Sequence, residues 1–133
     1  MNPIRLKRAY EPPGEDEGAR VLVDRLWPRG VSRAKARIEL WLKDAAPSAE
    51  LRAWFGHRPE RWEEFARRYE AELKANEGAL APLRDLLAQG PVTLVYAAHD
   101  AERNNAVVLV RYLGRGGEAG GAGTQRRAAK DRR

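Results

Sequence analysis

Two polar segments of the sequence, residues 24–32 and 99–105, each follow a short apolar run and carry side chains suited to binding an anion. The candidate ligand-binding residues in them are Arg25, Trp27, Arg29, Asp100, Arg103, Asn104 and Asn105. Arginine forks hydrogen-bond to carboxylates and phosphates, and free backbone N–H groups at the start of a helix also attract anions. An indole ring between two arginines could cover a flat ligand. If the two segments lie side by side, their composition predicts an anion-binding site.

Three side chains could carry protons in such a site: Asp24, His57 and His99. Each of these groups has structural alternatives. Asp24 can form an ion pair with Arg25 at a strand end, and His57 can cap a helix. In the second segment, Asp100 can act as a helix N-cap and the two asparagines as a capping network. The residue types therefore leave a ligand site and a structural scaffold equally open.

The sequence contains no motif for a metal ion or a cofactor. There is no P-loop and no glycine-rich dinucleotide fingerprint, and two histidines without local ligand spacing do not form a zinc site. Asp24 and Asp100 could share a divalent ion, but no third carboxylate lies at a suitable spacing. The chain has no cysteine, which excludes disulfides, thiolate nucleophiles and iron–sulfur clusters. We therefore expect no cofactor, and the reaction class stays open.

The excess positive charge is concentrated at the C-terminus of the 133-residue chain. The formal net charge is +6, and residues 114–133 hold six basic and two acidic side chains among several glycines. This segment has no apolar periodicity, so we expect a disordered tail after a single domain over residues 1–113. The tail is either a solubilising appendage or a nonspecific contact to nucleic acid. No apolar run is long enough for a membrane span and residues 1–8 do not form a signal peptide, so we expect a cytoplasmic protein.

Apolar periodicity predicts strands and helices that alternate along the chain. The expected strands are 4–7, 20–24, 38–42 and 92–98, and the expected helices are 32–36, 48–56, 59–73, 80–90 and 106–113. Gly114 is expected to end the last helix. This alternation predicts an α/β fold with a mostly parallel sheet of about four strands flanked by about five helices. Ligands of such sheets bind at the carboxyl ends of the strands, where both polar segments would lie if strands 20–24 and 92–98 are neighbours.

Several motifs occur in the same order as in a known bacterial family. They are VDRLWPRGVS at 23–32, WLKDAAPS at 41–48, LRAWFGH at 51–57, FARRY at 65–69, VTLVYAA at 92–98 and NNAVVL at 104–109. Over residues 4–113 the chain resembles the YeaO-like family, a branch of the bacterial domain-of-unknown-function family 488. The resemblance implies a compact α/β domain and assigns no reaction. Wider members of that family place cysteines after the last strand, whereas this chain has none, so thiol chemistry does not carry over.

Together these observations predict a small cytoplasmic α/β domain that binds an anionic small molecule at its strand ends. A nucleotide, a phosphorylated metabolite or a carboxylate would suit the site, and the domain could also act on it as an enzyme. The alternative is a nucleic-acid-binding accessory protein that uses the basic tail and the loop at residues 24–30. A third reading is a protein-interaction module without a ligand. The sequence leaves the oligomeric state open.

Overall fold

Four parallel strands form the central sheet in this computed structural model, which describes the backbone of residues 2–119 and the side chains of residues 2–115. The strands are β1 (Ile4–Arg8), β2 (Ala19–Leu22), β3 (Leu40–Trp41) and β4 (Val92–Tyr96). Their order across the sheet is β1-β4-β2-β3, and every neighbouring pair is parallel. The expected parallel α/β sheet is therefore confirmed. The central strand β4 is buried along its whole length.

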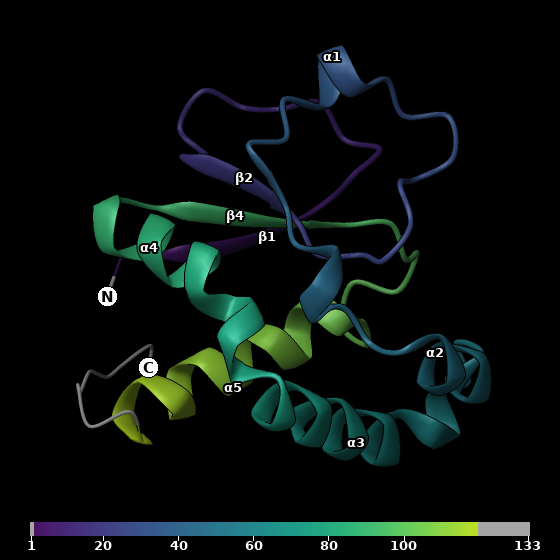
Figure 1. The fold of residues 1–133 in the computed structure, drawn as a ribbon. Coiled ribbons are helices and arrows are strands. Elements are labelled where there is room, and N and C mark those ends of the chain that lie inside the picture. The colour runs from purple at the N-terminus through teal and green to yellow at the C-terminus, as the bar shows by residue number, and fades with distance from the viewer. Residues whose placement is uncertain (1, 120–133) are drawn as a thin grey trace.

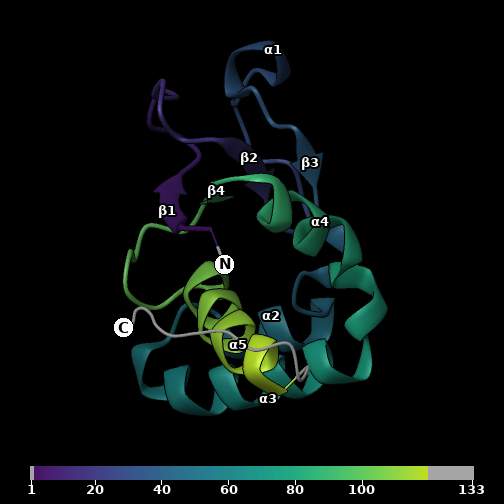
Figure 2. The ribbon, with the colours of Figure 1, turned by 90° about the vertical axis from the view of Figure 1, so that its left-hand side faces the viewer.

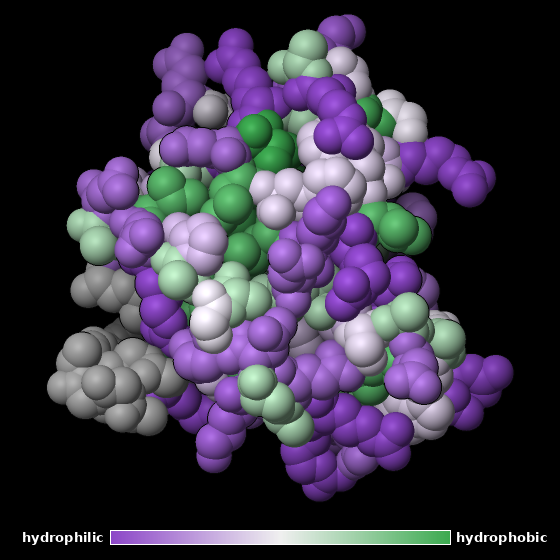
Figure 3. All heavy atoms as spheres, viewed as in Figure 1, coloured by the Kyte–Doolittle hydropathy of each residue, from purple (hydrophilic) through white to green (hydrophobic). Residues whose placement is uncertain are grey.

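The helices occupy mainly one face of the sheet. They are α1 (Arg33–Ala36), α2 (Ala49–Phe55), α3 (Trp62–Ala75), α4 (Ala81–Gln89) and α5 (Asn105–Ala119). Short 3₁₀ turns occupy Lys43–Ala45, Pro59–Arg61 and Glu77–Leu80. Helices α2 to α5 lie beneath the sheet, whereas α1 and the chain around it lie above (Figures 1 and 2). The space-filling view shows hydrophilic residues over most of one face, with hydrophobic residues visible near β2 and α4 (Figure 3).

Both faces of the sheet carry apolar side chains because consecutive strand residues point to opposite sides. Beneath the sheet, Val21 and Leu94 join the main core, in which Tyr69 of α3 and Leu109 of α5 are fully buried. Above the sheet, Leu22 belongs to a smaller core with two partly buried tryptophans. Burial on both faces explains the continuous apolar run in β2 and is typical of parallel sheets.

Helix boundaries follow the capping residues in the sequence. The Ser48 hydroxyl accepts a hydrogen bond from the Leu51 N–H at 3.1 Å and begins α2. Gly56, with φ of 52°, ends that helix in the left-handed conformation. Ser32 caps α1 in the same way as Ser48 caps α2. Pro82 lies in the first turn of α4, where its missing N–H costs nothing. The expected helices 32–36, 48–56 and 80–90 thus correspond to α1, α2 and α4.

The last helix is longer than the sequence analysis predicted. Helix α5 continues through Gly114 to Ala119, so the expected end at Gly114 is wrong. A glycine in a helix costs only about 1 kcal/mol relative to alanine, and a helix already anchored in the core by Leu109 and Leu113 can extend through it. The remainder of the expected disordered tail, residues 120–133, lies outside the described residues. Within residues 2–119, no helix is both long and apolar enough to cross a bilayer.

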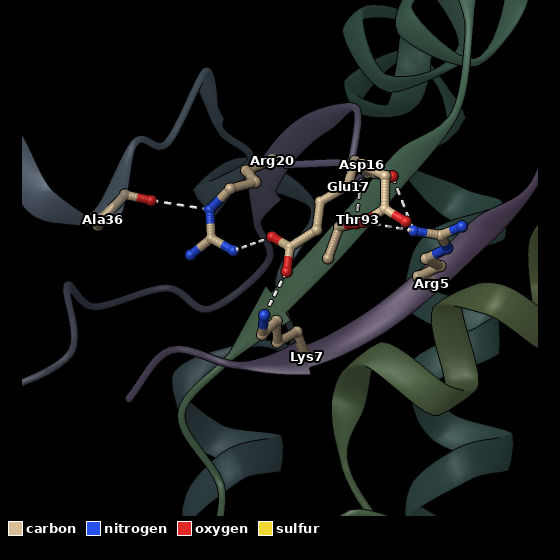
Figure 4. Close-up of polar contacts among 7 residues, drawn as sticks. All are labelled: Arg5, Lys7, Asp16, Glu17, Arg20, Ala36 and Thr93. Atoms are coloured by element: carbon tan, nitrogen blue, oxygen red, sulfur yellow. Dashed lines mark hydrogen bonds and ion pairs between the residues drawn. The ribbon is translucent and has the colours of Figure 1, made fainter. Parts of the chain in front are cut away.

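A buried ionic network ties the β1–β2 loop to the upper face of the sheet (Figure 4). Glu17 receives hydrogen bonds from Lys7 of β1 and from Arg20 of β2, the latter at 2.5 Å. Arg20 also donates from Nε to the Ala36 carbonyl oxygen at 2.8 Å, and the Thr93 hydroxyl donates to the Glu17 carbonyl oxygen at 2.7 Å. Glu17 and Arg20 are only 6% and 4% exposed. The network thus buries Glu17 although its loop consists of polar residues, prolines and glycines.

Candidate functional site

Strands β2 and β4 are neighbours, so the two polar segments leave the sheet at the same edge. The Val23 N–H donates to the Val95 carbonyl oxygen at 3.0 Å, which continues the parallel pairing up to that edge. A cavity of about 620 Å³ opens there between the two loops, α2 and α3. Its lining includes all ten candidate site residues named from the sequence. The condition for a shared site, adjacent strands, is therefore met.

Asp24 is partly buried in the wall of this cavity, and both of its carboxylate oxygens accept hydrogen bonds. Oδ2 accepts from the Ala97 N–H at 3.0 Å, and Oδ1 accepts from the Asn105 amide at 3.1 Å. Burial raises the pKa of Asp24, and the hydrogen bonds from Asn105 and Ala97 offset that effect only in part. The backbone at Asp24 is fixed too, because the Trp41 indole N–H donates to its carbonyl oxygen at 2.8 Å.

Arg25 supports the chain before α2 and forms no ion pair with Asp24 among the described residues. Its guanidinium group donates to the carbonyl oxygens of Pro47 at 3.2 Å and Ala46 at 3.3 Å. The next residue, Ser48, donates from its N–H and its hydroxyl to Glu72 of α3, at 2.9 and 2.6 Å. The sequence alternative of an ion pair at the strand end is thus wrong, because Arg25 reaches backbone carbonyls instead.

The second loop is held by its own caps. Asp100 Oδ1 accepts from the N–H groups of Glu102 at 2.9 Å and Arg103 at 3.1 Å, and Oδ2 accepts from the Arg103 guanidinium at 3.1 Å. The Glu102 N–H is the main cause that lowers the pKa of Asp100. Asn104, rather than Asp100, caps α5: its Oδ1 accepts from the Val107 N–H at 3.1 Å, and its amide donates to the Asp100 carbonyl oxygen at 2.9 Å. The capping interpretation therefore holds for Asn104, whereas Asp100 caps the turn before α5 and not the helix itself.

Asn105 joins the two loops directly. Its amide donates to the Val23 carbonyl oxygen at 2.9 Å as well as to Asp24. This side chain connects the first turn of α5 to the end of β2. Asn105 therefore fixes the relative position of the two cavity walls and orients the Asp24 carboxylate.

Trp27 lines the cavity but is held firmly by its neighbours. Its indole N–H donates to the Val31 carbonyl oxygen at 2.8 Å. Its ring packs edge-on against Trp41, with centroids 5.5 Å apart, and the Arg33 guanidinium lies 4.4 Å from its centroid. These contacts place Trp27 in the upper core of the sheet. It forms a fixed part of the cavity wall.

The two histidines lie on the exposed rim of the cavity. His57 follows Gly56 in a left-handed conformation with φ of 58°, and its ring lies 6.0 Å from that of Phe55. Its proximity to Asp24 favours the ionised form of that carboxyl, although burial is the dominant cause and leaves the pKa of Asp24 raised. His99 follows β4 and is likewise exposed.

The cavity also contains residues that the sequence reasoning missed. The most important is Arg52, an exposed arginine of α2 that lines the cavity. Phe55 and Phe65 stack with centroids 4.3 Å apart and form an apolar wall. Neither ring was among the candidate site residues, because an apolar side chain in a helix gives no sign that it faces a cavity. The only sequence signal for Arg52 was its place in the motif that contains His57.

Four arginines and two aspartates line the cavity, so its formal charge is positive. Arg103 pairs with Asp100. Among the side chains of residues 2–115, no carboxylate lies within ion-pair distance of Arg25, Arg29 or Arg52. The same part of the chain holds no group of three or more His, Asp or Glu side chains arranged to bind a metal ion.

The fold and this cavity define a small parallel α/β domain with an arginine-rich cleft at the carboxyl edge of its sheet. The model of the inactive DUF488-N3 subclade matches residues 3–127, and the chain belongs to this family. The family resemblance drawn from the sequence motifs is confirmed. The match also extends past Leu113, where the resemblance drawn from the motifs ends, into the basic C-terminal segment.

Two relatives show how much of the chain is shared. An uncharacterised protein of Mycobacterium tuberculosis strain H37Rv is 47% identical over 110 residues, which cover 83% of this chain and 92% of the relative. Uncharacterised protein YeaO of Escherichia coli K12 is 38% identical over 110 residues, which cover 83% of this chain and 96% of the relative. No solved structure matches the chain significantly.

Proposed function

We propose that the protein binds an anionic small molecule in the cavity at the carboxyl edge of β2 and β4. The observation that carries the proposal is the set of arginines in this cavity that face no carboxylate partner in the described structure. Guanidinium groups bind phosphates and carboxylates through paired, charge-assisted hydrogen bonds. Arg52 is the arginine chosen for the test, because it is exposed and acts on the charge of Asp24, whereas Arg25 already donates to two backbone carbonyls.

The size and lining of the cavity favour a small molecule. Its volume of about 620 Å³ lies within the usual range for ligand cavities. Stacked Phe55 and Phe65 provide an apolar wall. Tyr10 and Leu26, which are 49% and 63% exposed, also line the cavity and are two of the three large hydrophobic residues exposed in the described structure. A ligand with a nonpolar part would cover these side chains.

The lining favours binding over turnover. Among the described residues, no cysteine, serine, threonine or lysine lines the cavity, so covalent chemistry would depend on its aspartates, its histidines or Tyr10. The oxygens of Asp24 already accept two N–H groups. The family description, an inactive subclade, agrees with a role in binding.

A thermal-shift screen of the full chain against nucleotides, sugar phosphates and carboxylates tests the proposal. A ligand present at one hundred times its dissociation constant should add about 2.7 kcal/mol of stability. Arg52→Ala should remove this shift. The matched control is Arg67→Ala, which removes one exposed arginine from α3, away from the cavity lining.

Two results would contradict the proposal. One is a full screen without a hit. The other is a hit that Arg52→Ala retains, because the anion would then lie elsewhere. The alternative of nucleic-acid binding predicts oligonucleotide affinity that falls steeply with salt and weakens when residues 115–133 are removed. Fluorescence anisotropy with a labelled oligonucleotide distinguishes the two functions.

A further inference from the structure

The cavity combines its arginines with one carboxylate, Asp24, which no arginine pairs with in the described structure. Each Asp24 oxygen accepts one hydrogen bond, whereas a carboxylate has about four acceptor sites. At least one acceptor position on this group can therefore serve a ligand, since Asp24 lines the cavity. A ligand with only negative charge would be repelled at this point.

Arg52 of α2 lies close enough to Asp24 to act on its charge, as does His57, which follows the end of that helix. Opposite charges thus face the cavity within the reach of one small molecule. Such an arrangement selects a ligand that has an anionic end for Arg52 and a hydrogen-bond donor for Asp24. Neighbouring hydroxyl groups of a sugar are suitable donors, because a carboxylate can accept both of them.

We propose that the ligand is a sugar phosphate with free hydroxyl groups, which donate to Asp24 while the phosphate binds Arg52. This inference rests on the proposed function and defines its ligand class. The apolar wall of Phe55 and Phe65 suits the carbon face of a sugar or the base of a ribonucleotide. The ligand could thus be a free sugar phosphate or a ribonucleotide, which share the sugar phosphate and differ only in the base.

Isothermal titration calorimetry with chosen probes tests the inference on the unmodified full chain. Ribose 5-phosphate and phenyl phosphate both carry a phosphate and a ring, but only the first has hydroxyl groups. We expect ribose 5-phosphate to bind at least about tenfold more tightly, because a hydrogen bond to a charged acceptor is lost with phenyl phosphate. Adenosine 5′-monophosphate distinguishes a free sugar phosphate from a ribonucleotide. If it binds more tightly than ribose 5-phosphate, the wall of Phe55 and Phe65 contacts a base.

Two variants locate the contacts. Asp24→Asn should weaken ribose 5-phosphate binding by about tenfold and leave phenyl phosphate binding unchanged or stronger. Arg52→Ala should weaken both. Equal affinity of the unmodified protein for the two probes would overturn the inference while leaving the proposed anion site intact. If no phosphate or carboxylate ligand binds at all, the proposed function itself fails, and the sugar phosphate assignment fails with it.

Discussion

Replacement of Glu17 by glutamine tests the buried ionic network above the sheet. The variant removes one negative charge and keeps the size of the side chain. Arg20 then stays buried without its carboxylate, and its Nη2 atom already has no hydrogen-bond partner among the described residues. The Lys7 side chain is 22% exposed, so its ammonium group can turn toward water. The cost of the substitution therefore falls mainly on Arg20.

We expect Glu17→Gln to lower the free energy of unfolding by about 3–5 kcal/mol, the usual cost of removing one partner from a buried ion pair. The Glu17 and Arg20 side chains are 7% and 4% exposed, so water cannot replace the missing charge. For a domain of this size, the loss corresponds to a fall in melting temperature of roughly 10–20 °C.

The pH dependence gives an independent readout of the same network. Burial would raise the pKa of Glu17, but hydrogen bonds from Lys7 and Arg20 outweigh it and hold the pKa below its ordinary value of 4.5. A carboxyl with a lowered pKa adds stability above its unfolded value, and this contribution is lost as the pH falls through the folded value. The stability difference between the unmodified protein and Glu17→Gln should therefore be full at neutral pH and shrink below pH 4.5.

Urea denaturation of the full chain measures these changes. Glu15→Gln is the matched control, because Glu15 is exposed in the same loop. Adding Arg20→Met to Glu17→Gln should recover part of the lost stability, since the uncompensated charge is then removed. Equal small losses in Glu17→Gln and Glu15→Gln would refute the reasoning. So would a double variant that is less stable than Glu17→Gln alone.

Three further variants test single contacts. Gly18→Ala should lower the urea midpoint more than Gly30→Ala, although both residues have positive φ, because a Cβ at Gly18 would lie 2.2 Å from the Pro91 carbonyl oxygen and one at Gly30 would meet nothing within 4 Å. Equal losses would contradict this steric argument. Asn104→Ala should cost about 1–3 kcal/mol and speed amide hydrogen exchange in the first turn of α5, because it removes a cap and a buried hydrogen bond; unchanged exchange would count against the cap. Asp24 has a raised pKa, so the free energy of unfolding of the unmodified protein relative to Asp24→Asn should fall as the pH rises from 3.8 through the folded pKa. Urea denaturation at several pH values measures this difference, and a difference that increases with pH would contradict the predicted sign.

Local sequence signals predicted the elements that local physics determines. The expected helix 48–56 agrees with α2, because its start at the Ser48 cap and its end at the left-handed Gly56 each depend on a few neighbouring residues. The end of α5 was predicted wrongly at Gly114. A glycine weakens a helix by an amount that tertiary contacts of the preceding turns can outweigh. The error shows that a weak local preference does not define a helix end.

The sequence predicted the cavity only on the condition that strands 20–24 and 92–98 are neighbours in the sheet. Parallel strands place their carboxyl ends at one edge, so two loops could be expected to meet there. The contribution of Arg52 depends on where α2 packs against that edge, and no periodicity in the sequence contains that information. The burial of Glu17 was missed for the same reason, because its partner Lys7 comes from β1, which is not adjacent to β2 in the sheet.

The cavity residues divide into those that hold the loops and those whose side chains remain available to a ligand. Arg25 and Asn104 donate to backbone carbonyls, and Asn105 donates to a carbonyl and to Asp24. Substitutions at these three positions should therefore lower stability and affect binding only through the loop positions. Arg52 has no ion pair among the described side chains, so its loss should leave the melting temperature of the free protein nearly unchanged. A substitution that changes ligand affinity without changing stability is therefore the signature that separates a binding residue from a scaffold residue in this cavity.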